Sequence, residues 1–337
     1  MSRFFTGISL LVLMMVSTSC NRLLRPTAGG GAGNRGNNGA NNAPNTNVNF
    51  NGTVVKNVVY STAPNYRGAE QQLALDVYKP EGAAGKKFPV IFIMHGGGFV
   101  GGDKMNLTST ASKLANNGYV VVSLNYRLGF GNTLKPSCTD SNLVKQAIYR
   151  SVQDAYAAID YVIKRADEYN IDKDWVFIGG QSAGAITALM TAYLQKNDQV
   201  LFPNFNASMG SLPQAAAGFT VRGVISMWGA FIDPQFITAK TALPTIFFQG
   251  ELDKAVPFNS RPFVGCPTAT KIYGTNPLYN RLKSLGVTTI AHVDPQGGHG
   301  VFDEDFRVNN ILCFLNDVRQ GVKKQVYLTG VQNSCDK

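Results

Sequence analysis

The order of hydrophobic and polar residues from Thr53 onward predicts strands that alternate with helices. Residues 53–61 (TVVKNVVYS) and 73–80 (LALDVYKP) mix apolar and polar positions, as expected of strands with one exposed face. Residues 88–96 (FPVIFIMHG) and 119–127 (YVVVSLNYR) are nearly continuous apolar runs, which are typical of strands covered on both faces. This order indicates a sheet whose first strands are partly solvated and whose later strands are buried.

The same alternation continues along the rest of the chain. Helical patterns cover residues 107–116, 145–169, 185–194 and 302–318, and residues 280–285 have the pattern of the end of a helix. Strand patterns cover residues 175–180, 221–229, 244–250 and 288–294. Helices that connect strands in this way form right-handed crossovers, so we expect an α/β fold with a mostly parallel, doubly wound sheet and helices on both faces. The first two strands are expected to be antiparallel. Ligands of such sheets bind at the carboxyl ends of the strands.

The first 20 residues have the pattern of an export signal. Arg3 precedes an apolar stretch, residues 8–16, that is too short to span a bilayer. Small residues then lead to Cys20. The pattern resembles a bacterial lipoprotein signal, in which residues 1–19 are removed and Cys20 carries the lipid, although Ser17 stands where an aliphatic residue is usual. Cleavage without lipidation is the alternative. Either process gives an exported protein: a periplasmic, outer-membrane or cell-surface lipoprotein, or else a secreted protein.

The composition changes again after this signal. Residues 26–51 are nearly all Gly, Asn, Ala and Thr and contain almost no side chain able to build a core. We therefore predict that residues 20–52 hold the lipid-attachment cysteine and a flexible tether with a reach on the order of 25 to 30 Å. Residues 53–337 are expected to form the catalytic domain, because 44% of the 337 residues are hydrophobic, which is enough for one large core.

The positive charge of the chain is dispersed. The formal net charge is +10 at pH 7, yet the longest basic runs are pairs such as Lys86-Lys87 and Lys323-Lys324. Nucleic-acid binding usually gathers basic residues on one face or stripe. We therefore interpret the charge as a solvated basic surface and expect no nucleic-acid partner.

The chain has five cysteines, and export to an oxidising compartment makes their number informative. If Cys20 carries a lipid, an even set remains: Cys138, Cys266, Cys313 and Cys335. Four cysteines allow three pairings, of which we favour Cys138 with Cys266 and Cys313 with Cys335. The spacing proves neither pairing, and Cys313, inside an apolar run, is also compatible with a buried free thiol.

A candidate nucleophile lies where a predicted strand meets a predicted helix. Residues 180–184 read GQSAG, which places Ser182 in a G-x-S-x-G motif between an apolar run and a helical run. The small residues on both sides allow the tight, strained turn that lifts a hydroxyl clear of a sheet. The motif is common by chance in a Gly-rich chain, so its weight depends on whether the sequence also supplies a base.

The chain offers three histidines as that base. His95 opens an HGGG motif directly after a strand, and His292 lies inside the last predicted strand, a position typical of the core. His299 lies in the Gly-rich loop QGGHG between the last strand and the last helix, where a flexible turn can bring its imidazole to Ser182. We therefore predict that His299 is the general base; the competing interpretation is a solvated loop histidine.

Asp253 is the predicted acid that orients this histidine. It follows a predicted strand and lies between Ser182 and His299 in the chain. A carboxylate in this role fixes the imidazole tautomer and stabilises the imidazolium. Glu251 and Asp294, also beyond strand ends, are its rivals, and any of the three is compatible with an ordinary loop carboxylate.

Backbone N–H groups that can bind a negative oxygen are available in HGGG, residues 95–98. Glycines after a strand let the backbone approach a substrate closely with its N–H groups turned inward. The predicted oxyanion hole consists of Gly97 and Gly98 together with the N–H of Ala183, which follows the candidate nucleophile. HGGG alone is compatible with an ordinary loop. The GQSAG motif in the same chain is what favours its interpretation as an oxyanion hole.

Together these motifs resemble the α/β-hydrolase superfamily, and within it the carboxylesterases and the hormone-sensitive-lipase-like esterases. The resemblance covers residues 73–316 and includes HGGGF, NYRLG, the helix 152–172, GGQSAG and GELDKAVP in that order. It implies the chain order nucleophile, acid, histidine. It also implies a structural role for His95, which orients the glycine loop, and a packing role behind the sheet for Asp154. Gln181 departs from the acidic residue that often precedes the nucleophile, which weakens assignment to a subfamily.

The loops around this site are expected to set its specificity. Only a short segment separates the strands 221–229 and 244–250, so no large lid domain is expected there. Substrate contacts are expected from the loops 132–141, 195–217 and 256–273. The aromatic residues Phe99, Tyr126 and Phe258 are candidates for the pocket, although such residues are more often part of a core.

These observations predict an exported serine esterase that hydrolyses short-chain or carbohydrate-linked acyl esters through an acyl-enzyme. Ser182, His299 and Asp253 suffice for this chemistry, so neither a metal nor an organic cofactor is expected. The expected partners are a small or polysaccharide-linked ester and a membrane reached through Cys20, with no obligate protein partner. Two alternatives remain: a serine peptidase of the prolyl-oligopeptidase type, which HGGG disfavours, and a tethered binding protein that has the fold without the activity.

Overall fold

The computed structural model describes residues 49–130, 138–194, 209, 218–262, 265–267 and 271–335. The predicted signal peptide (residues 1–19), Cys20 and most of the tether (20–52) lie outside these residues, as do parts of the three loops expected to contact substrate. By its internal contacts the chain divides into residues 1–42 and 43–337, and all described residues belong to the second unit. The assignment of residues 1–52 to a signal and a tether stays a prediction.

The described residues form one large sheet with the strand order β1-β2-β4-β3-β5-β6-β7-β10-β11. Its strands are β1 (Thr53–Pro64), β2 (Glu70–Lys79), β3 (Phe88–Met94), β4 (Val120–Leu124), β5 (Ile171–Gln181), β6 (Val221–Met227), β7 (Thr245–Gly250), β10 (Thr289–Asp294) and β11 (Gln325–Thr329). β2 is antiparallel to both β1 and β4, whereas the pairs from β4 onward are parallel. This topology confirms the predicted mostly parallel, doubly wound sheet with antiparallel strands at its start.

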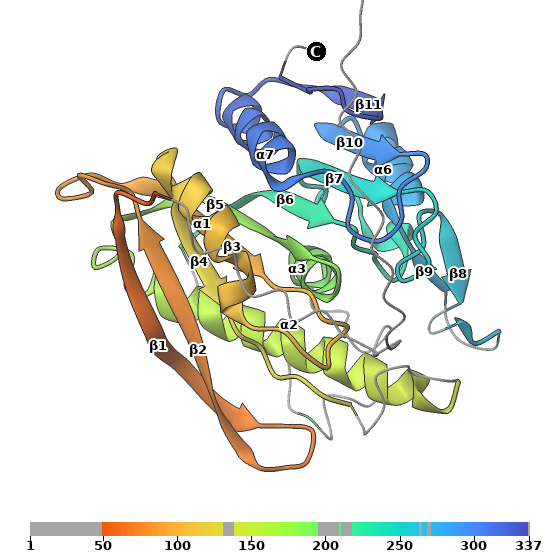
Figure 1. Ribbon diagram of the computed structural model, residues 1–337, viewed down its shortest axis with the longest axis horizontal. Helices are drawn as coiled ribbons and strands as arrows, with labels where there is room; N and C mark the ends of the chain where they lie inside the picture. The colour runs from red at the N-terminus through yellow and green to blue at the C-terminus, as the bar shows by residue number, and fades with distance from the viewer. Residues whose placement is uncertain are drawn as a thin grey trace, which may run out of the picture. The chain divides into compact units, whose positions relative to one another are not determined.

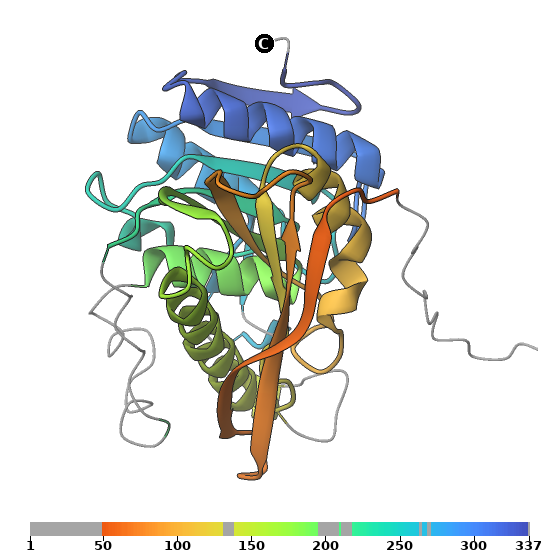
Figure 2. The ribbon, with the colours of Figure 1, turned by 90° about the vertical axis from the view of Figure 1, so that its left-hand side faces the viewer.

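Helices cover both faces of the sheet (Figure 1). One face carries α2 (Ser141–Ile163), α3 (Ala183–Tyr193) and α6 (Thr275–Ser284), and the other carries α1 (Thr108–Asn116) and α7 (Glu304–Arg319). Figure 2 shows the β1–β2 hairpin from its outer side, with α2 and α1 on opposite sides of the sheet. Among the described residues, no helix combines the length and the apolar character that a membrane crossing requires.

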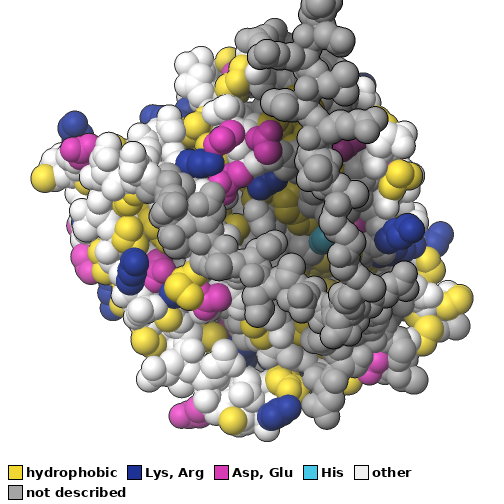
Figure 3. Space-filling model, in the orientation of Figure 1, with side chains coloured by type: hydrophobic (Ala, Val, Ile, Leu, Met, Phe, Trp, Pro, Cys, Tyr) yellow, Lys and Arg dark blue, Asp and Glu magenta, His cyan; other side chains and the backbone are white. Residues whose placement is uncertain are grey.

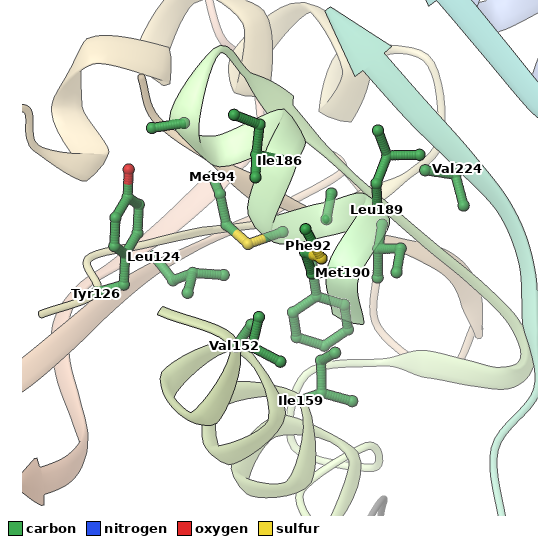
Figure 4. Close-up of a cluster of buried hydrophobic side chains, with 14 of the residues drawn as sticks. Phe92, Met94, Leu124, Tyr126, Val152, Ile159, Ile186, Leu189, Met190 and Val224 are labelled. Carbon is green, nitrogen blue, oxygen red and sulfur yellow. The ribbon is translucent and has the colours of Figure 1, made fainter. Parts of the chain in front are cut away.

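The core forms because the inner strands bury both of their faces. Side chains alternate along β3, so Phe92 and Met94 point toward α2 and α3 while Ile91 and Ile93 point toward α1 and α7. Figure 4 shows the first of these two clusters, in which residues of β3 and β4 pack against residues of α2 and α3. The helices that flank the sheet are thereby fixed against it, and the loops at the carboxyl ends of its strands rest on a rigid base.

One helix differs from its predicted bounds, and the beginning of another was not predicted. α2 begins at Ser141 and ends at Ile163, whereas the sequence predicted residues 145–169. The residues after Ile163 form turns that lead into β5: Asn170 has a left-handed φ of 60°, and the N–H of Ile171 donates to Ala166 O (2.7 Å). α6 (Thr275–Ser284) begins before residues 280–285, which the sequence predicted as the end of a helix.

Several short elements were not predicted. The expected loop 256–273 contains an antiparallel pair, β8 (Ser260–Pro262) and β9 (Lys271–Tyr273). β11 follows α7 and lies parallel to β10 at the edge of the large sheet.

One disulfide joins Cys138 to Cys266, and a second joins Cys313 of α7 to Cys335 beyond β11. These are the two pairings favoured from the sequence, so Cys313 is not a free thiol in this structure.

Candidate active site

Ser182 occupies a strained turn between β5 and α3. Its backbone has φ 52° and ψ −117°, a conformation that non-glycine residues rarely adopt. The turn is possible because its flanking glycines are in close contact: a Cβ on Gly180 would lie 2.5 Å from the carbonyl carbon of Gly184, and a Cβ on Gly184 would lie 2.1 Å from Met94 O. The N–H of Ser182 donates to Met227 O of β6 (2.9 Å). The predicted motif therefore forms a tight strand-turn-helix that presents the hydroxyl above the sheet.

His299 lies within hydrogen-bonding distance of this hydroxyl. Its Nε2 is 2.8 Å from Ser182 Oγ, and it belongs to the loop between β10 and α7. His95 and His292 are buried. Figure 3 shows a histidine side chain beside hydrophobic side chains on this face of the molecule. The structure thus brings together the predicted nucleophile and the predicted base, which are far apart in the sequence.

Asp253 completes the hydrogen-bonded row. Its Oδ2 lies 2.8 Å from His299 Nδ1, and its Oδ1 accepts from the N–H groups of Ala255 (2.8 Å) and Val256 (2.9 Å). Burial favours the neutral acid, but the hydrogen bonds from His299 and the two N–H groups outweigh burial, so the pKa of Asp253 lies below its ordinary value. The carboxylate is therefore ionised near neutral pH and faces the imidazole.

The rival carboxylates lie nearby but do not contact His299 in this way. Glu251 donates its N–H to Asp294 O (3.0 Å), and the Asp294 side chain accepts from the N–H of Gln296 (3.0 Å). The first of these contacts connects the loop after β7 to the end of β10, and the second lies within the loop after β10. Glu251 and Asp294 therefore help to join the two loops that carry Asp253 and His299.

The rival histidines have other environments. His95 is buried, its ring stacks on Tyr126 (centroids 4.5 Å apart), and its Nδ1 lies 2.7 Å from Gly96 O. His292 stacks on Phe248 in the core, and burial lowers its pKa to about 4. Burial also lowers the pKa of His95. Neither imidazole is in a position to accept a proton from Ser182.

The glycine loop after β3 runs directly beside the candidate nucleophile. A Cβ on Gly96 would lie 3.3 Å from the Cβ of Ser182. Gly97 and Gly98 have left-handed φ values of 116° and 61°, and a Cβ on Gly97 would lie 2.0 Å from Gly101 O. Ala183 is the first residue of α3, where N–H groups have no partner in a preceding turn. The glycine loop and the start of α3 thus lie next to Ser182, and the role of Gly97, Gly98 and Ala183 as oxyanion donors stays a prediction.

The other residues discussed for the site are structural. Asp154 is buried and pairs with Arg127, which donates its backbone N–H (2.7 Å) and its side chain to the carboxylate. Phe99, Tyr126 and Phe258 are buried in the core, as such aromatics usually are. No group of three or more His, Cys, Asp or Glu within the described ranges has the arrangement of a metal site.

Two contacts of the site were missed from the sequence. The indole of Trp228, directly after β6, packs edge-on against His299 (ring centroids 6.1 Å apart), and Arg307 of α7 lies over the same indole (5.2 Å). Gln249 of β7 donates from Nε2 to Asp253 Oδ2 (3.1 Å). Both residues lie in predicted strand runs and were given no role in the site. Their positions at strand ends, next to the expected site, were the available signal.

Residues 75–231 match the sequence model of the BD-FAE family. The matched segment contains the glycine loop and the turn at Ser182, and it ends before Asp253 and His299. The match therefore includes Ser182 and the glycine loop, whereas Asp253 and His299 are connected to them only by the contacts in the structure.

The chain is also similar to curated esterases. Esterase LipQ of Mycobacterium tuberculosis is 25% identical over 272 residues, which are 72% of this chain and 57% of that protein. Esterase E4 of Myzus persicae is 32% identical over 146 residues, 41% of this chain and 25% of that protein. Fumonisin B1 esterase of Sphingopyxis macrogoltabida is 30% identical over 132 residues, 38% of this chain and 24% of that protein. The chain thus spans less than two thirds of the length of each of these relatives.

Solved structures of Thermogutta terrifontis esterase 2 have the same fold. The butyrate-bound structure superposes with a TM-score of 0.56 at 18% identity and covers 79% of this chain and 94% of that one. The structure phosphorylated by paraoxon gives a TM-score of 0.54 at 19% identity, over 81% of this chain and 95% of that one. At such low identity the similarity concerns the fold, including the sheet and the helices on its two faces.

Proposed function

We propose that this chain, which belongs to the α/β-hydrolase superfamily, is a serine esterase that cleaves carboxylic esters through an acyl-enzyme. The observation that carries the proposal is the unbroken row of 2.8 Å contacts from Ser182 Oγ to His299 and from His299 to Asp253. The similarity to several curated esterases supports the same class of reaction.

The proposed reaction begins with attack of Ser182 Oγ on the ester carbonyl. His299 Nε2 takes the serine proton as the bond to carbon forms, and the buried Asp253 carboxylate stabilises the resulting imidazolium through Nδ1. The carbonyl oxygen becomes negative and is bound by the N–H groups of Gly97, Gly98 and Ala183.

Collapse of this tetrahedral intermediate gives the acyl-enzyme, which water then hydrolyses in a second step. His299 returns the proton to the alcohol oxygen, the alcohol leaves, and the acyl group remains on Ser182. A water molecule, deprotonated by His299, attacks the acyl carbonyl, and the acid is released with the serine hydroxyl restored. The first proton transfer joins two atoms that are already 2.8 Å apart, Ser182 Oγ and His299 Nε2, and the cycle needs no further reactant than the ester and water.

The proposed substrates are short-chain or carbohydrate-linked acyl esters. Between β6 and β7 the chain contains only a short 3-10 turn, Pro234–Phe236, and no inserted lid. The side chain of His299 remains 31% exposed, so it is accessible from solvent. An accessible site of this kind suits a soluble or polymer-linked ester.

A substrate panel tests this proposal. The purified domain should hydrolyse p-nitrophenyl acetate or butyrate, and the panel should add longer acyl chains, acetylated xylan, feruloyl esters and a peptide amide. Loss of ester hydrolysis in Ser182→Ala is the expected result. Cleavage of the peptide amide in preference to every ester would favour a peptidase, and a protein that cleaves nothing would favour a binding role.

We further propose that the protein is exported and anchored through Cys20. The support is the sequence of residues 1–20, with its basic start, apolar stretch and small residues before the cysteine. Labelled palmitate should be incorporated in the wild type and absent in Cys20→Ser. A protein that stays in the cytoplasm with residues 1–19 attached would contradict export.

A further inference from the structure

Gln249 is a buried amide adjacent to the row of Ser182, His299 and Asp253. It lies near the carboxyl end of β7 with no exposed surface. Its Nε2 donates to Asp253 Oδ2 (3.1 Å) and to Val256 O (3.0 Å), and its Oε1 accepts from the hydroxyl of Thr275 (2.9 Å). Both polar atoms of the amide are therefore engaged, and one partner is the carboxylate that contacts the imidazole.

The surroundings of the amide allow one orientation only. Both neighbours of Nε2 are oxygens that cannot donate, a carboxylate and a backbone carbonyl, whereas the Thr275 hydroxyl can. Rotating the amide by 180° would place Oε1 against both of these oxygens in a site without solvent, which is strongly unfavourable. Thr275, itself fully buried, therefore determines how Gln249 is oriented.

The amide in turn restricts the carboxylate. Asp253 Oδ2 receives hydrogen bonds from both His299 and Gln249, and Oδ1 receives the N–H groups of Ala255 and Val256. A rotation of the carboxylate plane would break at least one of these buried hydrogen bonds. The contact between Asp253 and His299 is thus one of four that hold the carboxylate in a single position.

Thr275 has a fixed position because the start of α6 is tied to the loop after Asp253. The N–H of Gly274 donates to Asn259 O (2.7 Å), and the N–H of Asn276 donates to Phe258 O (3.1 Å). A Cβ on Gly274 would overlap Pro257 O, so the two segments are in direct contact. The hydroxyl of Thr275 is therefore presented to Gln249 by a rigid backbone.

We propose that Gln249 and Thr275 are positioning residues of the active site: Thr275 orients the amide of Gln249, and the amide holds the Asp253 carboxylate against His299. The inference rests on the proposed function, which gives Asp253 its role. Neither side chain contacts the proposed nucleophile or base directly, so their loss should lower the chemical rate and leave KM unchanged. Gln249 should matter more than Thr275, because its hydrogen bond is to an ionised group.

The test measures two reactions of Gln249→Leu, Thr275→Val and Thr275→Ser. The first is the rate at which diethyl p-nitrophenyl phosphate phosphorylates Ser182; the serine oxygen bonds to phosphorus, p-nitrophenolate leaves and His299 takes the proton. The second is kcat and KM for p-nitrophenyl butyrate. Gln249→Leu should slow both reactions roughly tenfold to a hundredfold, and Thr275→Val roughly threefold to tenfold, with KM unchanged. Thr275→Ser keeps the hydroxyl and should recover most of the rate.

A double variant separates positioning from a general loss of structure. In Asp253→Ala the amide has no carboxylate to hold, so adding Gln249→Leu should cause no further loss of rate. Gln320→Leu is the matched control for the same substitution away from the site, because Gln320 is an exposed glutamine at the end of α7. Wild-type rates in Gln249→Leu, or an equal loss with and without Asp253, would overturn the inference. If Ser182 is phosphorylated but no ester is cleaved, the proposed function fails, while the phosphorylation rates still decide the role of Gln249.

Discussion

The indole of Trp228 lies edge-on to the imidazole of His299, with ring centroids 6.1 Å apart and an interplanar angle of 65°. Trp228 has a left-handed φ of 46° directly after β6, next to the strained turn at Ser182 on β5. Arg307 lies over the indole and also donates to the carbonyls of Val301 (3.2 Å) and Phe302 in the histidine loop. Trp228 and Arg307 therefore support the loop that carries His299 from two sides.

Replacing this indole should affect both stability and turnover. Trp228 is 7% exposed, so Trp228→Ala should lower the free energy of unfolding by about 3 to 5 kcal/mol. It should also lower kcat about tenfold, because the imidazole gains freedom to leave Ser182. Trp175→Ala, at the other tryptophan of the chain and near the start of β5, is the control and should leave kcat unchanged. Equal effects of the two changes on kcat would contradict this role of Trp228.

The sequence predicted those site residues whose identity depends on local pattern. Ser182 is marked by its glycines, and His299 by its place in the Gly-rich loop between the last strand and the last helix. Gln249 and Trp228 carry no such mark, because each lies in an apolar run and gains its role from residues far away in the chain, such as Thr275 and His299. A single amide inside a buried strand was nevertheless a signal, since a buried polar group must find partners.

The strands with strong hydrophobic periodicity could be predicted from the sequence. A strand whose position depends on contacts with distant residues could not. The inner strands β3 and β5 to β7 were found from their apolar runs. β11 was missed because only Leu328 of its five residues is buried, so its pattern is weak. Its position is set by pairing with β10 and by the disulfide between Cys313 and Cys335, neither of which a local pattern contains.

Changes in the proposed triad should remove nearly all activity without unfolding the protein. Ser182→Ala and His299→Ala should each lower kcat by about 10⁴-fold or more, and Asp253→Asn by about 10⁴-fold, because the imidazole then loses its orienting carboxylate. Glu251→Gln is the matched control at the rival carboxylate and should retain activity. Hydrolysis of p-nitrophenyl butyrate, with circular dichroism to verify folding, measures these effects. Full activity in His299→Ala would exclude the proposed base.

The glycine loop offers a matched pair of substitutions. A Cβ at Gly97 would lie 2.0 Å from Gly101 O, so Gly97→Ala must displace the loop and should lower kcat by about 10² to 10³ through loss of an oxyanion donor. Gly98 has no atom within 4 Å of the same position, so Gly98→Ala suffers only from its left-handed φ, at a cost of about 1 kcal/mol. Turnover of one ester by both variants compares them. A larger loss in Gly98→Ala than in Gly97→Ala would show that the backbone contact at Gly97 is unimportant.

His292 should make the stability of the protein depend on pH. Its pKa falls from 6.5 to about 4 because of burial, so the unfolded chain binds a proton that the folded protein resists. The free energy of unfolding should therefore decrease as pH falls from about 6.5 to about 4, by about 3 kcal/mol from this residue. Urea unfolding at pH 7.5 and 4.5 measures the decrease. His292→Phe keeps an aromatic ring against Phe248 and should show a smaller decrease; an identical decrease would exclude His292 as its source.

The disulfide between Cys313 and Cys335 should stabilise the edge of the sheet without affecting catalysis. It closes a loop with a sequence separation of 22, and next to it Ser334 donates from its N–H (2.7 Å) and its hydroxyl (2.9 Å) to Asn310 Oδ1. Replacing both cysteines by serine should lower the free energy of unfolding by about 3 kcal/mol, because the unfolded chain regains the freedom that the cross-link removes. The kcat for p-nitrophenyl butyrate should stay unchanged at 25 °C, since the remaining contacts of β11 with β10 keep the folded state intact. Guanidinium unfolding of the two proteins gives the stability difference. An unchanged unfolding midpoint in the double variant would mean that β11 is held by its strand pairing and side-chain hydrogen bonds alone.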